Sequence, residues 1–168
     1  MLADIFEMHD IPVTFDSNLD NVTLMTSELL SDGTSVIRIN KDLIGKVTQD
    51  YISEAFLHEI VHSLTMSAFV LKATPEQVRL VDSTNKLLRS LRKEYFGNYN
   101  AYNNIDSITY ALKNNREFVS VFITDAEARN ELFSIAKQLD MRQLGKVIGR
   151  LINFINSVTR FLVNKNII

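Results

Sequence analysis

The hydrophobic periodicity of this 168-residue chain changes near Thr48, and this change indicates its fold class. Before Thr48, residues 11–15 and 35–39 are short, rich in β-branched side chains and bounded by Asp, Asn, Ser and Gly, which is typical of strands. Residues 21–25 form a third candidate strand, and residues 31–33 a turn. After Thr48 the apolar residues recur at helical spacing. We therefore predict an α+β fold, with a small and mostly antiparallel N-terminal sheet packed on a helix and an α-helical C-terminal half.

Capping residues predict where several helices begin. Thr48 or Asp50 precedes an apolar stripe that runs to Leu64, and Thr74 with Pro75 starts a helix that reaches about residue 96. An Asn- and Tyr-rich loop is expected over residues 97–106. Three further helices are predicted, over residues 114–122, over 124–139 with Thr124 or Asp125 as the cap, and over 142–163.

Composition limits the class of protein. Neither repeats nor linkers interrupt the chain, so we expect a single domain over residues 1–168, with a core over 1–139 and a helical extension over 140–168. The 18 basic and 20 acidic residues leave a net charge of −2, so we expect no nucleic-acid partner. No apolar run is long enough to span a membrane, and the N-terminus has no signal-peptide pattern, so we expect a cytoplasmic protein.

The strongest chemical signal is the run His58-Glu59-Ile60-Val61-His62. Residues four apart on a helix project from one face, so the two imidazoles can converge on one cation. The intervening Glu59 then lies beside the metal and can take a proton from metal-bound water. Zinc is the ion expected for imidazole and carboxylate ligands with an open position, and we predict one zinc per chain. The alternative is a pair of surface histidines next to carboxylates such as Glu54.

A catalytic zinc site needs a third protein ligand. His9, the only other histidine, precedes the first predicted strand and is expected to be a surface or core-packing residue. Glu117 borders the apolar face of the helix predicted over residues 114–122, an unusual place for a carboxylate without a partner. From spacing alone, a solvent-exposed glutamate beside Arg116 is an equal alternative.

The sequence resembles the zincin-like metallopeptidases that use a glutamate as third ligand. It is most similar to the compact zincin domains of phages and mobile elements and to the catalytic domain of anthrax-toxin lethal factor. These share H-E-x-x-H, a variable helical insert, and a Tyr seven residues before a Glu-Phe pair. Here Glu117-Phe118 follows His62 by 55 residues, and Tyr110 stands seven residues before Glu117.

The resemblance implies a role for each of these residues. His58, His62 and Glu117 would bind zinc, Glu59 would be the general base, and Tyr110 would donate a hydrogen bond to the oxyanion. The family also has an edge strand before the metal helix that pairs with bound peptide, and residues 35–39 occupy that place in the sequence. Many relatives have a second glutamate four residues after the ligand, where this chain has Val121. That supporting hydrogen bond is therefore lost.

Two helical surfaces carry no catalytic motif. One basic face is expected on the helix that starts at Thr74 and another on the tail. Solvated helix faces are the simplest explanation for both, and contact with a nucleic acid or an acidic partner is the alternative. Their members are Lys86, Arg89, Arg92 and Lys93 on the helix, and Arg142, Lys146, Arg150 and Arg160 on the tail. The apolar face of the tail helix over 142–163 either covers the core or docks on a protein partner, and we favour docking.

Two function classes follow, and a third interpretation, nucleic-acid binding, rests on the basic faces alone. The first is a zinc-dependent metallopeptidase that hydrolyses peptide bonds in a peptide or protein substrate. The second is a zincin-derived structural or assembly module, such as a phage virion component, that binds partners through its tail helix. Glu59 and Tyr110 favour the enzyme because a structural metal site requires neither, whereas Val121 and the tail favour the module.

Overall fold

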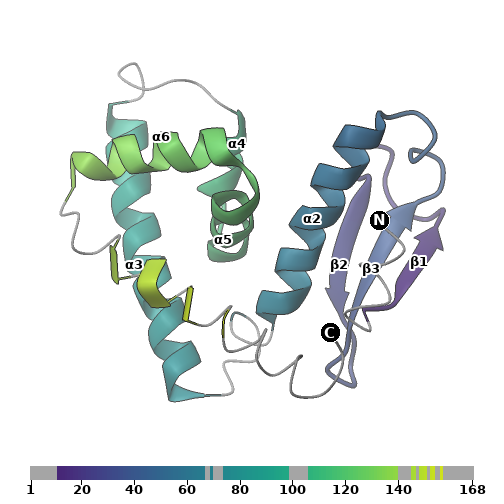
Figure 1. Ribbon diagram of the computed structural model, residues 1–168, viewed down its shortest axis with the longest axis horizontal. Coiled ribbons are helices and arrows are strands. Elements are labelled where there is room, and N and C mark those ends of the chain that lie inside the picture. Colours follow the sequence, from purple (N-terminus) through teal and green to yellow (C-terminus); the bar gives the residue numbers. More distant parts are fainter. Residues whose placement is uncertain are drawn as a thin grey trace. The chain divides into compact units, whose positions relative to one another are not determined.

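A computed structural model describes residues 11–66, 69, 74–98, 106–139, 145–146, 148–150, 152–153 and 156. They belong to two compact units, one holding residues 11–66 and the other holding the described residues from 69 to 156. The first unit combines a three-stranded sheet with one helix, and the second is helical, so the predicted α+β class is confirmed (Figure 1). The expectation of a single domain with a core over 1–139 and an extension over 140–168 stays a prediction.

The sheet of the first unit is mixed, with strand order β1-β3-β2. Its strands are β1 (Val13–Asp16), β2 (Met25–Leu29) and β3 (Ser35–Asn40). β1 pairs with β3 in parallel, and β2 pairs with β3 in antiparallel orientation. The predicted mostly antiparallel sheet is therefore wrong for one of its two pairings. The edge position predicted for residues 35–39 is also wrong, because β3 is hydrogen-bonded on both sides and lies at the centre.

The second strand begins where its predicted range of 21–25 ends. The carboxylate Oδ1 of Asp20 accepts hydrogen bonds from the backbone N–H groups of Val22 and Thr23, at 3.0 and 2.6 Å, which hold this segment in a turn. The Thr23 side chain and these two N–H groups lower the pKa of Asp20. The buried Asn40 side chain donates to the Asp20 and Thr23 carbonyls, at 2.9 and 3.1 Å, and joins the turn to β3.

The turn between β2 and β3 depends on Gly33, whose φ is +86°. Leu30 N–H donates to the Thr34 carbonyl at 2.8 Å, and Gly33 N–H donates to the Leu30 carbonyl at 3.0 Å. A residue with a Cβ is strained at this φ, whereas glycine adopts it readily. The turn predicted over residues 31–33 is therefore confirmed.

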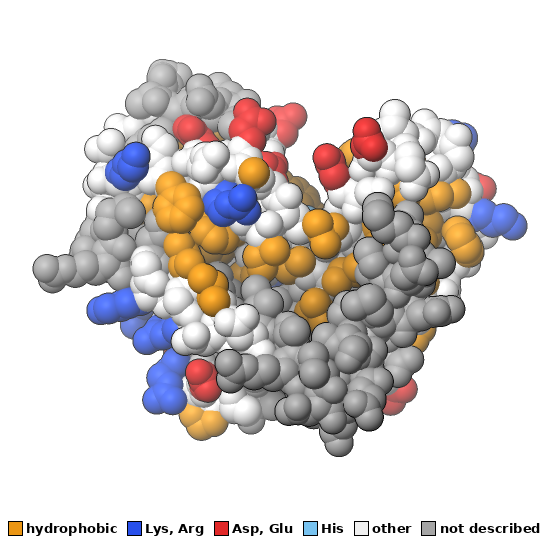
Figure 2. All heavy atoms as spheres, viewed as in Figure 1, with side chains coloured by type: hydrophobic (Ala, Val, Ile, Leu, Met, Phe, Trp, Pro, Cys, Tyr) orange, Lys and Arg blue, Asp and Glu red, His pale blue; other side chains and the backbone are white. Residues whose placement is uncertain are grey.

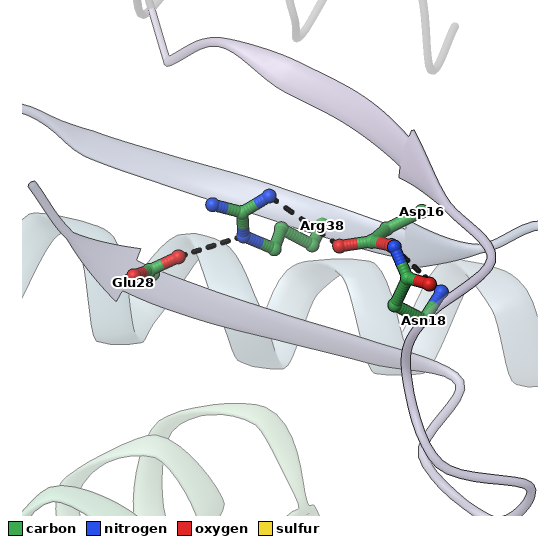
Figure 3. Close-up of polar contacts among 4 residues, drawn as sticks. All are labelled: Asp16, Asn18, Glu28 and Arg38. Carbon is green, nitrogen blue, oxygen red and sulfur yellow. Dashed lines mark hydrogen bonds and ion pairs between the residues drawn. The ribbon is translucent and has the colours of Figure 1, made fainter.

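One ion-pair network crosses all three strands of the sheet (Figure 3). Arg38 on β3 donates from Nε to Glu28 on β2 at 2.7 Å and from Nη1 to Asp16 on β1 at 3.4 Å. The hydrogen bond to Glu28 is the main reason why the pKa of Arg38 is raised. Ile37 and Ile39, on either side of Arg38 in sequence, are buried, which confirms their predicted alternation with a polar face.

Helix α2 (Gln49–Met66) covers the apolar face of the sheet and contacts β2 and β3. The Thr48 hydroxyl accepts a hydrogen bond from Tyr51 N–H at 3.3 Å, which confirms Thr48 as the cap. The buried residues of this core come from the strands, the loop before β2 and one face of α2. They are Leu24, Met25, Ile37, Ile39, Phe56 and Ile60.

The second unit is built around α3 (Pro75–Gly97), α4 (Asp106–Ala111), α5 (Asn115–Thr124) and α6 (Ala126–Lys137) (Figure 1). Thr74 caps α3 in a reciprocal arrangement with Gln77, and Asn114 and Asp125 cap α5 and α6, so three predicted helix starts are confirmed. The short α4 was not predicted, because its six residues are too few for a helical repeat to be recognised.

Part of the predicted tail helix over 142–163 can be checked. Residues 145–146, 148–150, 152–153 and 156 are helical, and the rest of that range lies outside the described residues. None of the helices in the described part of the chain is both long enough and apolar enough to cross a membrane.

We expect Gly33→Ala to destabilise the protein by about 1 kcal/mol, because the left-handed backbone at this position strains any side chain although nothing lies within 4 Å of the added Cβ. Gly45→Ala is the matched control, since its Cβ also meets no atom within 4 Å and its φ lies outside the left-handed region. Urea denaturation of the three proteins measures the difference. Equal stability of the two variants would contradict the role given to Gly33.

Candidate metal centre

The two histidines of the H-E-x-x-H motif project from the side of α2 opposite the sheet. Phe56 and Ile60 face the sheet core, and His58 lies two residues after Phe56, about 200° further around the helix. His62 is one turn beyond His58 on the same side. The Nε2 atoms of the two imidazoles are 3.0 Å apart, and the ring planes are nearly perpendicular at 85°. The predicted convergence of the two histidines is therefore confirmed.

Burial separates this pair from ordinary surface histidines. His62 is 6% exposed, and His58 and Glu59 are half-buried. Glu54, the carboxylate that we considered as a surface partner, is exposed. The alternative of two surface histidines is therefore wrong for His62.

Glu117 is placed by the start of α5. The Asn114 side chain accepts hydrogen bonds from the backbone N–H groups of Arg116 and Glu117, both at 3.0 Å, and so fixes the first turn. The residues that follow, Phe118 and Val119, are almost completely buried. Glu117 itself is half-buried at the border of this apolar face, as the sequence predicts.

His58, His62 and Glu117 form a group that could hold a metal ion. One ligand atom of each lies within 4.8 Å of the ligand atoms of the other two. Two nitrogen ligands of a tetrahedral zinc ion, each bound at about 2.0 Å, are about 3.3 Å apart. The 3.0 Å between the two Nε2 atoms is close to that value, and two imidazoles with one carboxylate are a donor set that zinc accepts.

The two other predicted catalytic residues, Glu59 and Tyr110, lie on α2 and α4. Glu59 is on α2 directly after His58. Tyr110 is on α4, 43% exposed, with the Lys113 ammonium group 5.6 Å from the centre of its ring. Their roles as general base and oxyanion donor stay predictions. His9 lies outside the described residues.

Comparison of the chain with protein-family models, with curated proteins and with solved structures finds no match. The resemblance to the zincin-like metallopeptidases therefore rests on the motif residues themselves.

Arg92 has a role that sequence reasoning missed. It was expected on a solvated basic face, but the residue is half-buried. Its guanidinium donates to two backbone carbonyls, to Leu112 at 2.5 Å from Nε and to Lys113 from Nη2. These carbonyls belong to the turn between α4, which carries Tyr110, and α5, which carries Glu117. Arg92 thus fixes the turn between the helices that carry Tyr110 and Glu117. No local sequence pattern predicts this contact.

We expect Arg92→Met to lower the free energy of unfolding by about 2 kcal/mol, since two charge-assisted hydrogen bonds to the α4–α5 turn are lost while the aliphatic stem is kept. Arg89→Met is the control. It removes the same charge from an exposed position of the same helix. Chemical denaturation measures both. If the two substitutions have the same effect, Arg92 does not anchor the turn.

Proposed function

We propose that this protein is a zinc-dependent metallopeptidase. The observation that carries the proposal is the group of His58, His62 and Glu117, whose ligand atoms lie within 4.8 Å of one another. Glu59 supports it, because the glutamate that follows the first histidine is the one that a hydrolytic zinc site uses as its base and a purely structural site does not need.

In this proposal His58, His62 and Glu117 hold the zinc ion. When bound, zinc supplies Lewis acidity that makes a water molecule acidic near neutral pH. Glu59 accepts a proton from the attacking water and passes it to the amine that leaves when the peptide bond breaks. The Tyr110 hydroxyl would donate a hydrogen bond to the substrate oxygen on which negative charge develops.

A peptide substrate would require a free strand edge, and β3 has none. Among the described residues, β1 and β2 are the outer strands of the sheet. Helix α2, which carries the two histidines, contacts β2 as well as β3. We therefore infer that an extended substrate pairs with the outer edge of β2. This replaces the edge strand over residues 35–39 that the resemblance implies.

We expect Glu59→Gln to lower peptide hydrolysis by about 100-fold or more while the zinc content is unchanged, because the amide cannot accept the proton and Glu59 is not a ligand. The assay uses zinc-loaded protein and a library of quenched fluorescent peptides. Glu54→Gln is the control, since it makes the same change of charge at an exposed position of the same helix.

Two results would contradict the proposed metallopeptidase activity. One is equal hydrolysis by the wild type and Glu59→Gln. The other is that zinc-loaded wild type cleaves no peptide faster than the metal-free protein does. Zinc binding without hydrolysis would instead support the zincin-derived structural module.

A further inference from the structure

A shallow concavity that shares no residue with the candidate metal centre lies on α3. A concavity of about 380 Å³ on this helix is lined by Lys86, Arg89, Ser90 and Lys93. These residues are three, four and seven positions apart, so they share one face of the helix. Three of the four lining residues are cationic and the fourth has a hydroxyl group, whereas none is acidic or apolar. We call this concavity the α3 groove.

No carboxylate of the described residues lies within ion-pair distance of the cations of the α3 groove. Lys86, Arg89 and Lys93 are exposed, and within the described part of the chain none of them forms an ion pair. The acidic residue adjacent to Lys93, Glu94, accepts a hydrogen bond from Asn98 near the end of the helix. A concave surface with several uncompensated positive charges attracts anions.

A fourth cation lies beside α3 on the N-terminal side of the α3 groove. The Arg150 guanidinium donates to the hydroxyl of Ser83, which lies on α3 three residues before Lys86. The positions from Ser83 to Lys93 span about 15 Å along the helix axis. Figure 2 shows mostly basic side chains on the part of the surface formed by α3. The positive charge is therefore a row and not a single point.

The positive charge of the chain is concentrated in its second part, which contains α3. Residues 1–66 carry 11 acidic and 3 basic residues, whereas residues 67–168 carry 9 acidic and 15 basic residues. The small net charge of −2, from which we expected no nucleic-acid partner, thus conceals two oppositely charged parts. Only the second part includes α3.

The chemistry of the lining distinguishes between possible polyanions. A protein partner is held mainly by aromatic and apolar anchors, and the α3 groove has none among its lining residues. A nucleic-acid backbone is held by Lys, Arg and hydroxyl groups, without contact to the bases. We propose that the α3 groove binds the phosphate backbone of a nucleic acid, independently of sequence. This site does not depend on zinc or on the proposed peptidase activity.

Fluorescence anisotropy of the full chain with a labelled 20-nucleotide single strand and a 20-base-pair duplex of DNA tests the proposal. Four phosphate contacts predict an affinity that falls by about 100-fold between 50 and 200 mM salt. We expect the triple variant Lys86→Ala, Arg89→Ala, Lys93→Ala to bind at least 10-fold more weakly at 50 mM salt, and its salt slope to be shallower by about 3.

The matched control is Lys41→Ala, Lys46→Ala, Lys137→Ala, which removes the same charge from exposed positions outside the α3 groove. We expect it to bind as the wild type does, with the same salt slope. Circular dichroism checks that both triple variants are folded.

Three results would overturn the proposal. The first is no binding of either DNA at 50 mM salt. The second is an equal loss of affinity in the two triple variants, since binding would then follow net charge and not the α3 groove. The third is that polyglutamate displaces the labelled DNA as strongly as unlabelled DNA of equal charge does. The α3 groove would then bind acidic protein segments.

Discussion

The contact between α2 and the sheet is the interaction on which the candidate metal centre depends. Phe56 and Ile60 are buried against the strand residues Ile37 and Ile39, and each such side chain contributes about 1.5–3 kcal/mol when it leaves water. Once this face of the helix is fixed, the 3.6-residue repeat sends His58 and His62 to the opposite side. The 3.0 Å between their Nε2 atoms therefore follows from one packed helix, without any flexible loop.

In the second unit, Glu117 is also held by local packing, but through different interactions. A cap from Asn114, a buried run after Glu117 and the Arg92 guanidinium on the preceding turn together hold the first turn of α5. These contacts are local to the second unit, so they fix the backbone at Glu117 whether or not a metal ion is bound. The same unit presents the α3 groove, which shares no residue with the proposed metal ligands.

Local patterns allowed the histidine pair and most helices to be predicted. Two side chains four residues apart on a helix always project from the same face. Capping residues such as Thr74 and Asp125 mark helix starts independently of tertiary contacts. The order of the strands could not be predicted, because the parallel pairing of β1 with β3 joins segments about 24 residues apart that no alternation pattern connects. The local pattern made Glu117 a candidate but left a solvent-exposed glutamate as an equal alternative, and the family resemblance decided between the two. Arg92 was misjudged because a charged residue that donates to backbone carbonyls has the same sequence pattern as one in solvent.

Zinc content is the most direct test of the proposed metal centre, because every catalytic role in the proposal depends on it. Elemental analysis of the purified protein after incubation with zinc at neutral pH should give about one zinc per chain. The same analysis should give one zinc for His9→Ala, which changes the histidine outside the motif, and none for His62→Ala. If the wild type holds no zinc, or if His62→Ala retains as much as the wild type, the 3.0 Å contact between the imidazoles is a hydrogen bond between two histidines and not a metal site.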